Sequence, residues 1–386
     1  MKQKLFLAAM AAIAMTSCSN DETLEINTGT ERAIDFRTAM ATRATETTTA
    51  TLSSFYVTAF NENIIEAPYF ANLEFTKTEP EKEGESTYFV SEDKYYYPGD
   101  GTDLTFYAYA PSATGLGSNI TTDSKNKNLT LTDFSPATKI VDQVDFITAN
   151  ATGNKSNAEA GVHLTFEHRL SQIEIKAIQQ NANNGYNFEI KGVRIAQAIS
   201  KGSFDFQNEE WTPSTTDKAN YDLEFDKAIP MTEQTILMDE CGGAMLIPQQ
   251  LTAWDVVNDK ENTSKGAYIS LLLRITTKDG ALVYPFKKDA EAEGEAKKTH
   301  AWAAIPVGTK WEAGKKYVYR LNFADGAGYV DPEENSNQGE PILNGEVKFD
   351  VEVTDWESHE FTGDMENGDI TEDLDETDTE DPWGDE

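Results

Sequence analysis

The residue types that most often carry catalysis or bind metals are scarce in this chain and poorly spaced for either task. It has two cysteines, Cys18 and Cys241, and four histidines. His163 and His168 are five residues apart, so on a regular strand they point to opposite faces and cannot chelate one metal ion. His168 shares a face with apolar residues, and we expect a hydrogen-bonded core histidine there. We predict no metal site and no catalytic histidine.

Motifs that bind phosphates or activate nucleophiles are also missing from the sequence. We find no G-x-x-x-x-G-K-[ST] loop, no C-x-x-C pair, no H-E-x-x-H and no G-x-S-x-G. Acidic neighbours of Cys241 disfavour the reactive thiolate, so we interpret this residue as an inert thiol. Paired carboxylates could serve a glycosidase, but among 67 Asp and Glu residues any pair is uninformative. The prediction is a protein without cofactor that is not an enzyme.

The charge of the chain excludes two further classes of partner. Its 67 acidic and 32 basic residues give a formal net charge of −35. Nucleic-acid binding rests on Lys and Arg meeting phosphates, and docking on anionic lipid also needs basic residues. We therefore expect neither partner.

Cys18 is the residue with the best-defined candidate chemistry. Two lysines precede an apolar run from Leu5 to Met15, and the small residues after it end at Cys18. The run of about 11 residues is too short to span a membrane, which takes roughly 20. Met15 to Cys18 resembles a lipobox, in which cleavage leaves the cysteine as an N-terminus for acylation. The alternative is a plain secretory signal with an incidental cysteine.

Most of the remaining chain consists of short stretches that favour strands. Apolar and polar residues alternate with a period of two, most clearly from Leu104 to Ala110, and Gly, Pro, Asn and Asp turns separate the stretches. This pattern predicts an all-β protein of β-sandwich domains. A polar stretch at Trp211–Asp217 indicates a boundary. We predict a signal peptide over residues 1–17, a linker over 18–33, an N-terminal domain over 34–212 and a C-terminal domain over 213–360.

Two local features add detail to this division into domains. A short strand from Ile34 to Ala39 precedes a Thr-rich stretch, 40–51, which contains Arg43 and is expected to be an exposed, cleavable loop. Apolar residues are even-numbered from Val162 to Leu170 and odd-numbered from Ile173, so we expect a β-bulge or break near Ser171–Gln172.

The C-terminal end of the chain is strongly acidic. Residues 360–386 hold 13 acidic residues and no Lys or Arg, which predicts a disordered tail over 361–386. Its spacing does not match an EF-hand loop, and loose calcium association is the alternative to a solvated tail.

Six segments, kept in order along the chain, resemble the fimbrillin family of Bacteroidetes, the subunits of type V pili. The first is YYYPGDGTDLTFYAYAP over Tyr95–Pro111, in which Tyr97 stands where the family usually has Trp. The others are Asp145–Ala149, Leu164–Ile173, Leu246–Gln249, Trp311–Tyr317 and Val353–Trp356. Each segment is modest alone, and the ordered set together with the lipobox is specific.

The resemblance implies two transthyretin-like β-sandwich domains in tandem and export as an outer-membrane lipoprotein acylated at Cys18. It also implies cleavage by a trypsin-like protease and strand exchange with other pilin subunits. The Arg43–Ala44 bond is the best candidate, because Arg32 and Arg37 flank or occupy the first strand. Cutting there would sever the anchor and that strand together and leave a groove for a strand of another subunit.

The position in the filament and the runner-up function also follow from the sequence. The stretch after Trp356 lacks alternating apolar residues, so the chain is better suited to accept a strand than to donate one. We expect a tip, minor or adhesive component with a host or bacterial surface ligand. Val347–Val353 could be a donor, but closing the second domain is the simpler role. The alternative is a surface-anchored glycan-binding lipoprotein that uses exposed aromatics such as Tyr95–Tyr97 or Trp254, with a hydrolase third.

Overall fold

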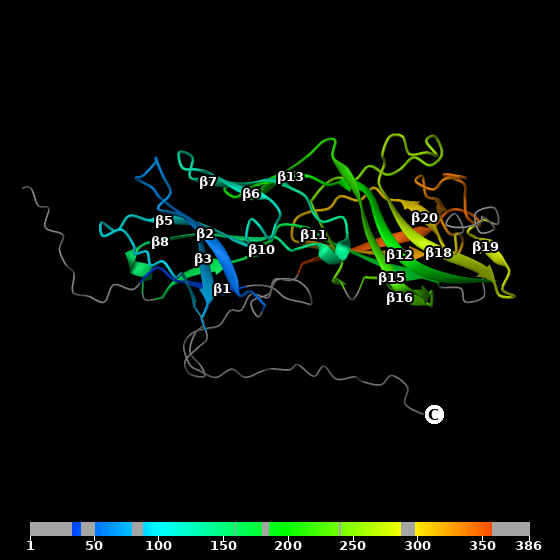
Figure 1. The fold of residues 1–386 in the computed structure, drawn as a ribbon, viewed down its shortest axis with the longest axis horizontal. Helices are drawn as coiled ribbons and strands as arrows, with labels where there is room; N and C mark the ends of the chain where they lie inside the picture. Colours follow the sequence, from blue (N-terminus) through cyan, green and yellow to red (C-terminus); the bar gives the residue numbers. More distant parts are fainter. Residues whose placement is uncertain are drawn as a thin grey trace, which may run out of the picture.

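The computed structural model describes residues 33–39, 51–78, 88–158, 160–179, 185–238, 241–286 and 298–356. Within these ranges the chain forms strands and two single-turn 3₁₀ helices, η1 (Ile140–Asp142) and η2 (Lys155–Asn157). The all-β class is confirmed, while the signal (1–17) and the tail (361–386) lie outside the described residues. Figure 1 shows an elongated molecule in which the sheets form two sandwiches side by side.

The first sandwich joins an eight-stranded sheet to a four-stranded one. In spatial order the larger sheet consists of β10 (Glu167–His168), β8 (Ile147–Gly153), β5 (Leu104–Ala110), β2 (Ser54–Asn61), β3 (Phe70–Lys77), β4 (Phe89–Val90), β1 (Phe36–Ala39) and β9 (Val162–Thr165). The smaller sheet consists of β14 (Glu210–Pro213), β13 (Gly202–Asp205), β7 (Asn128–Phe134) and β6 (Asn119–Asp123).

Strand β5, inside the larger sheet, is buried on both faces. Its residues Phe106 and Ala108 belong to a core built from this sheet and the segments next to its strands. Tyr107 and Tyr109 belong to a second core, which lies against the four-stranded sheet. The alternation in the sequence therefore separates two cores here, rather than a core from solvent.

The second sandwich joins a six-stranded sheet to a five-stranded one around a single large core. The six-stranded sheet consists of β15 (Lys218–Pro230), β12 (Tyr186–Ile199), β18 (Tyr268–Thr277), β20 (Ala301–Pro306) and β22 (Tyr329–Val330), with β19 (Leu282–Tyr284) beside β18. The five-stranded sheet consists of β16 (Gln234–Ile236), β11 (Ser171–Ile178), β21 (Lys315–Asn322) and β23 (Lys348–Asp355), with β17 (Ala244–Leu246) beside β11.

The strands of the two sandwiches interleave along the chain, which differs from the expected division at residues 212 and 213. Strands β11 and β12 precede that position, yet β11 pairs with β21 and β12 pairs with β15 and β18. The chain then returns to the first sandwich, where β13 pairs with β7 on one side and with β14 on the other. In Figure 1, β11 and β12 accordingly lie with the later strands, and β13 lies beside β6 and β7.

The change of face expected near Ser171–Gln172 occurs where the chain crosses between the sandwiches. Strand β10 ends at His168 and β11 begins at Ser171, so the break falls at Arg169–Leu170. The buried Arg169 side chain anchors the crossing: its Nε donates to Thr148 Oγ1 at 2.6 Å, and its Nη2 lies 2.8 Å from Glu209 Oε1. The periodicity changes because the flanking segments point into different cores.

Candidate functional site: the slot of the first strand

The residues with predicted chemistry all lie outside the described ranges. They are Cys18, the expected lipidation site, and Arg43 and Ala44, which flank the expected cleavage site. What the structure describes is the strand that precedes them, β1, and its surroundings. The strands on either side of β1 form a slot in which it lies.

Strand β1 is held between two other strands of the larger sheet. It runs parallel to β9 over four residue pairs, from Phe36 opposite Val162 to Ala39 opposite Thr165. On its other side it is antiparallel to β4, with Phe36 opposite Phe89. Before the strand begins, the Ile34 N–H donates to the Tyr95 carbonyl at 2.8 Å. Removal of this segment would leave backbone groups of β4 and β9 without their present partners.

The apolar side of β1 fills an aromatic socket. The ring of Phe36, which is fully buried, lies 4.7 Å from that of Phe75 and 5.1 Å from that of Phe106, both edge to face, and 6.0 Å from that of Phe55. Ile34, two residues earlier, is also buried in this core. The sequence placed Ile34 and Phe36 on one face, and the structure confirms that both are buried.

The opposite side of β1 is polar but also covered. The Arg37 guanidinium lies 4.7 Å from the centre of the Tyr88 ring and donates to the Tyr88 hydroxyl. Asp35 is buried, and its Oδ1 would lie 2.8 Å from a Cβ built on Gly161, whose φ is +73°. Burial raises the pKa of the nearby Tyr97 hydroxyl, and the Asp35 charge raises it further. The sequence did not reveal Tyr88 or Gly161, because they are distant from β1 in the chain.

A second buried group, at the junction of the sandwiches, is formed by His168, Asp145 and Trp356. His168 Nδ1 lies 2.9 Å from Asp145 Oδ2, and its ring stacks on Trp356 with centroids 4.1 Å apart and planes 5° apart. All three residues are buried, so the expected core histidine is confirmed, and His163 is exposed on the other face. Trp356 follows the last strand of the second sandwich but belongs to a core of the first.

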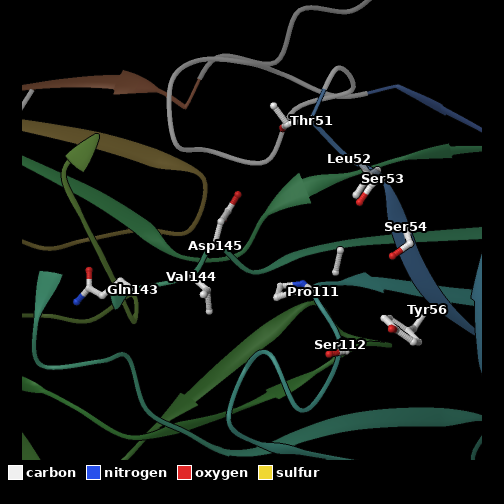
Figure 2. Close-up of a pocket in the computed structure, with 11 residues that line it drawn as sticks. Thr51, Leu52, Ser53, Ser54, Tyr56, Pro111, Ser112, Gln143, Val144 and Asp145 are labelled. Carbon is white, nitrogen blue, oxygen red and sulfur yellow. The ribbon is translucent and has the colours of Figure 1, made fainter. Parts of the chain in front are cut away.

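A shallow cavity of about 430 Å³ adjoins this junction. Figure 2 shows Thr51, Leu52 and Ser53 on one side, Pro111 and Ser112 below, and Asp145 near the centre. Thr51 is the first described residue after Ala39, and in sequence Arg43 lies between them. One end of the expected cleavage segment therefore starts beside the Asp145–His168–Trp356 group.

Strand β23 closes the edge of the five-stranded sheet, as the simpler interpretation of Val347–Val353 predicted. It pairs with β21 over eight residues, from Asp355 opposite Lys315 to Lys348 opposite Asn322. Apart from Val351, which is half-buried, its side chains are exposed; Phe349 is 37% and Val353 51% exposed.

The aromatic residues considered for sugar binding divide into two groups. Trp254 is buried, and its Nε1–H donates to the Asp259 carbonyl, so it cannot serve as a platform. Tyr97 is half-buried, whereas Tyr95 and Tyr96 are exposed. The Tyr95 ring packs 4.9 Å from the buried Phe70 ring.

Two further properties concern the described ranges alone. No group of three or more His, Cys, Asp or Glu residues there is arranged to hold a metal ion. Among the same residues no helix is long and apolar enough to cross a membrane. Cys241 is half-buried, and its Sγ lies 3.4 Å from the Met238 carbonyl.

Comparison with known proteins assigns the family. The model of the fimbrillin-like family matches residues 42–356, so the chain belongs to this family. The fimbrium subunit Fim1C of Phocaeicola vulgatus is 28% identical over 255 residues, which cover 58% of this chain and 66% of that protein. The chain thus matches slightly less than two thirds of that relative. A crystal structure of a fimbrial protein from Bacteroides vulgatus is 16% identical, with a TM-score of 0.55 over 84% of this chain and all of the other, and shares the fold.

Proposed function

We propose that this chain is a structural subunit of a type V pilus on the cell surface, assembled by removal of β1 and insertion of a strand from another subunit. The fimbrillin-like family and the similarity to a fimbrium subunit support the pilus role. The main support for the assembly step is the position of β1. This strand has only four residues, lies between two other strands of the sheet, and is followed in the sequence by Arg43.

Loss of β1 would leave an open site that a strand of another subunit could bind. The socket of Phe36 would open to water, and β4 and β9 would each expose an unpaired edge. An added strand restores the backbone hydrogen bonds, and alternate side chains refill the socket. Because burial of a Phe side chain contributes about 1.5–3 kcal/mol, the refilled state is strongly favoured over the empty one.

Anchoring and release complete the proposal. The chain would be exported with Cys18 acylated in the outer membrane, and a trypsin-like protease would then cut between Arg43 and Ala44. Both the lipid anchor and β1 lie before that bond in the chain, so one cut frees both. The acidic stretch after Trp356 supports a role at the tip or as a minor, adhesive component that binds a surface ligand, since it has no alternating apolar residues to donate.

The test is the N-terminus of the protein taken from the cell surface, measured by mass spectrometry. The wild-type chain is expected to start at Ala44 and to appear in filaments. The Arg43→Ala variant should keep acylated Cys18 and stay out of filaments, and the matched Arg32→Ala variant should be processed normally. A wild-type chain that starts at acylated Cys18 would contradict the proposal and favour the glycan-binding alternative.

A further inference from the structure

We propose that the slot of β1 selects its incoming strand by charge as well as by shape, and that the selected strand belongs to a different protein rather than to a second copy of this chain. The inference rests on the proposed strand exchange. It names the partner by chemistry: an extended segment with an aliphatic residue, an acid, an aromatic residue and a cation in successive positions, inserted parallel to β9.

Shape alone would let this chain fill its own slot. The socket takes an aliphatic residue at position 34 and an aromatic one at position 36. Val347, just before β23, and Phe349 within it have the same spacing, and Phe349 is 37% exposed, so it would gain burial in the socket. Apolar complementarity therefore does not distinguish β23 of a second copy from β1.

The position of Asp35 distinguishes them by charge and by space. The Asp35 side chain is buried against Gly161, which leaves no room for a longer side chain on that side. Residues 33–35 also line a cavity of about 440 Å³ together with Lys94 and Ser91. When Phe349 is aligned with Phe36, Lys348 takes the place of Asp35 and brings a second ammonium group into the space that Lys94 already lines.

The surroundings of Arg37 also disfavour the insertion of β23 from a second copy. Its guanidinium lies over the Tyr88 ring, whose face carries partial negative charge and attracts cations. In the same alignment Asp350 takes the place of Arg37. A carboxylate over that ring is repelled, and its short side chain cannot reach the contact that Arg37 makes. Both charges of β23 are thus reversed relative to those that the slot holds now.

The experiment uses the full chain with a site-specific protease sequence inserted between Arg43 and Ala44, so that a defined cut separates β1 from the rest of the chain and allows it to exchange. Fluorescent peptides are then offered in excess, and their incorporation is measured by gel filtration. They are residues 33–39; the same peptide with Asp35→Lys and Arg37→Asp; the same with Phe36→Ala; a Thr38→Ser control; and residues 346–352.

We expect the natural and Thr38→Ser peptides to exchange equally. The charge-reversed peptide, the Phe36→Ala peptide and residues 346–352 should each incorporate at least about tenfold less, equivalent to about 1.4 kcal/mol. A Lys94→Glu chain, changed at an exposed position, should take up a peptide carrying only Asp35→Lys better than the parent chain does.

Two outcomes would overturn the inference in different ways. Equal uptake of the natural peptide, the charge-reversed peptide and residues 346–352 would refute charge selection and leave a second copy as the partner, with strand exchange intact. Failure of every peptide, including the natural one, would refute strand exchange itself and the inference with it.

Discussion

Strands β1 and β23 are the first and last strands of the described chain, and they are held by opposite means. β1 has four residues, lies between two strands, and buries Phe36 completely. β23 has eight residues, pairs on one side only, and exposes most of its side chains. The shorter strand therefore depends on its side chains and the longer one on its backbone ladder. The length of a strand alone therefore does not show how much it contributes to the stability of its sandwich.

The largest expected effect comes from emptying the socket. Phe36→Ala should lower the free energy of unfolding by about 3–5 kcal/mol, because the rings of Phe75 and Phe106 cannot close the space. The matched change in β23, Phe349→Ala, should lower it by only about 1–2 kcal/mol, since 37% of that residue is already exposed. Urea unfolding measures the free energy of unfolding of both variants. Equal losses would show that the two strands do not differ in their dependence on side-chain burial.

Trp356→Ala should have the next largest effect, about 3 kcal/mol, because a buried ring leaves the junction and His168 loses its stacking partner. The loss should also reach β23, since Trp356 ties the end of that strand to the first sandwich. Hydrogen exchange of the amides of residues 348–355 should quicken. Val353→Ala, at an exposed position of the same strand, is the control and should leave exchange unchanged.

A smaller loss is expected from Gly161→Ala. The residue has a φ of +73°, and the new Cβ would lie 2.8 Å from Asp35 Oδ1, so strain of about 1–3 kcal/mol should loosen the start of β1. Limited proteolysis of the intact chain should then release residues before 51 more readily. Gly99→Ala, where a Cβ meets no atom within 4 Å, is the comparison, and the same release in both variants would refute a specific role for Gly161.

The smallest effect should come from the ion pairs that fasten β23. Arg320 contacts Asp350 and Glu352 on the strand, and all three side chains are substantially exposed. Arg320→Ala should therefore change stability little, and the difference from wild type should vanish at about 1 M salt, where the Debye length is about 3 Å. Thermal unfolding at low and high salt checks this, and a difference that survives high salt would mean that Arg320 stabilises β23 by packing rather than by its ion pairs.

Much of this architecture could be predicted because its signals are local. The alternation at Leu104–Ala110, the burial of Ile34 and Phe36, and the opposite faces of His163 and His168 all follow from the period of two along a strand. The change of parity after Leu170 was equally visible. The structural cause of this change could not be predicted, because a bulge and a crossing between sandwiches leave the same pattern in the sequence.

The candidate site was predictable only in part. The sequence pointed to the first strand and to Arg43, but not to the residues that form the slot. Tyr88 and Gly161 approach Arg37 and Asp35 through pairing between distant strands, which no short motif encodes. The interleaving of β11 and β12 into the second sandwich was missed for the same reason.

By itself the sequence determined the class of structure and the family, since both rest on composition or on patterns a few residues long. Only the tertiary structure decided which strands share a sheet, that Trp356 belongs to the first core, and that β1 lies between β4 and β9 with Phe36 buried. The physical reason is that side-chain periodicity specifies which face of a strand is apolar, whereas its neighbours are chosen by packing over the whole chain.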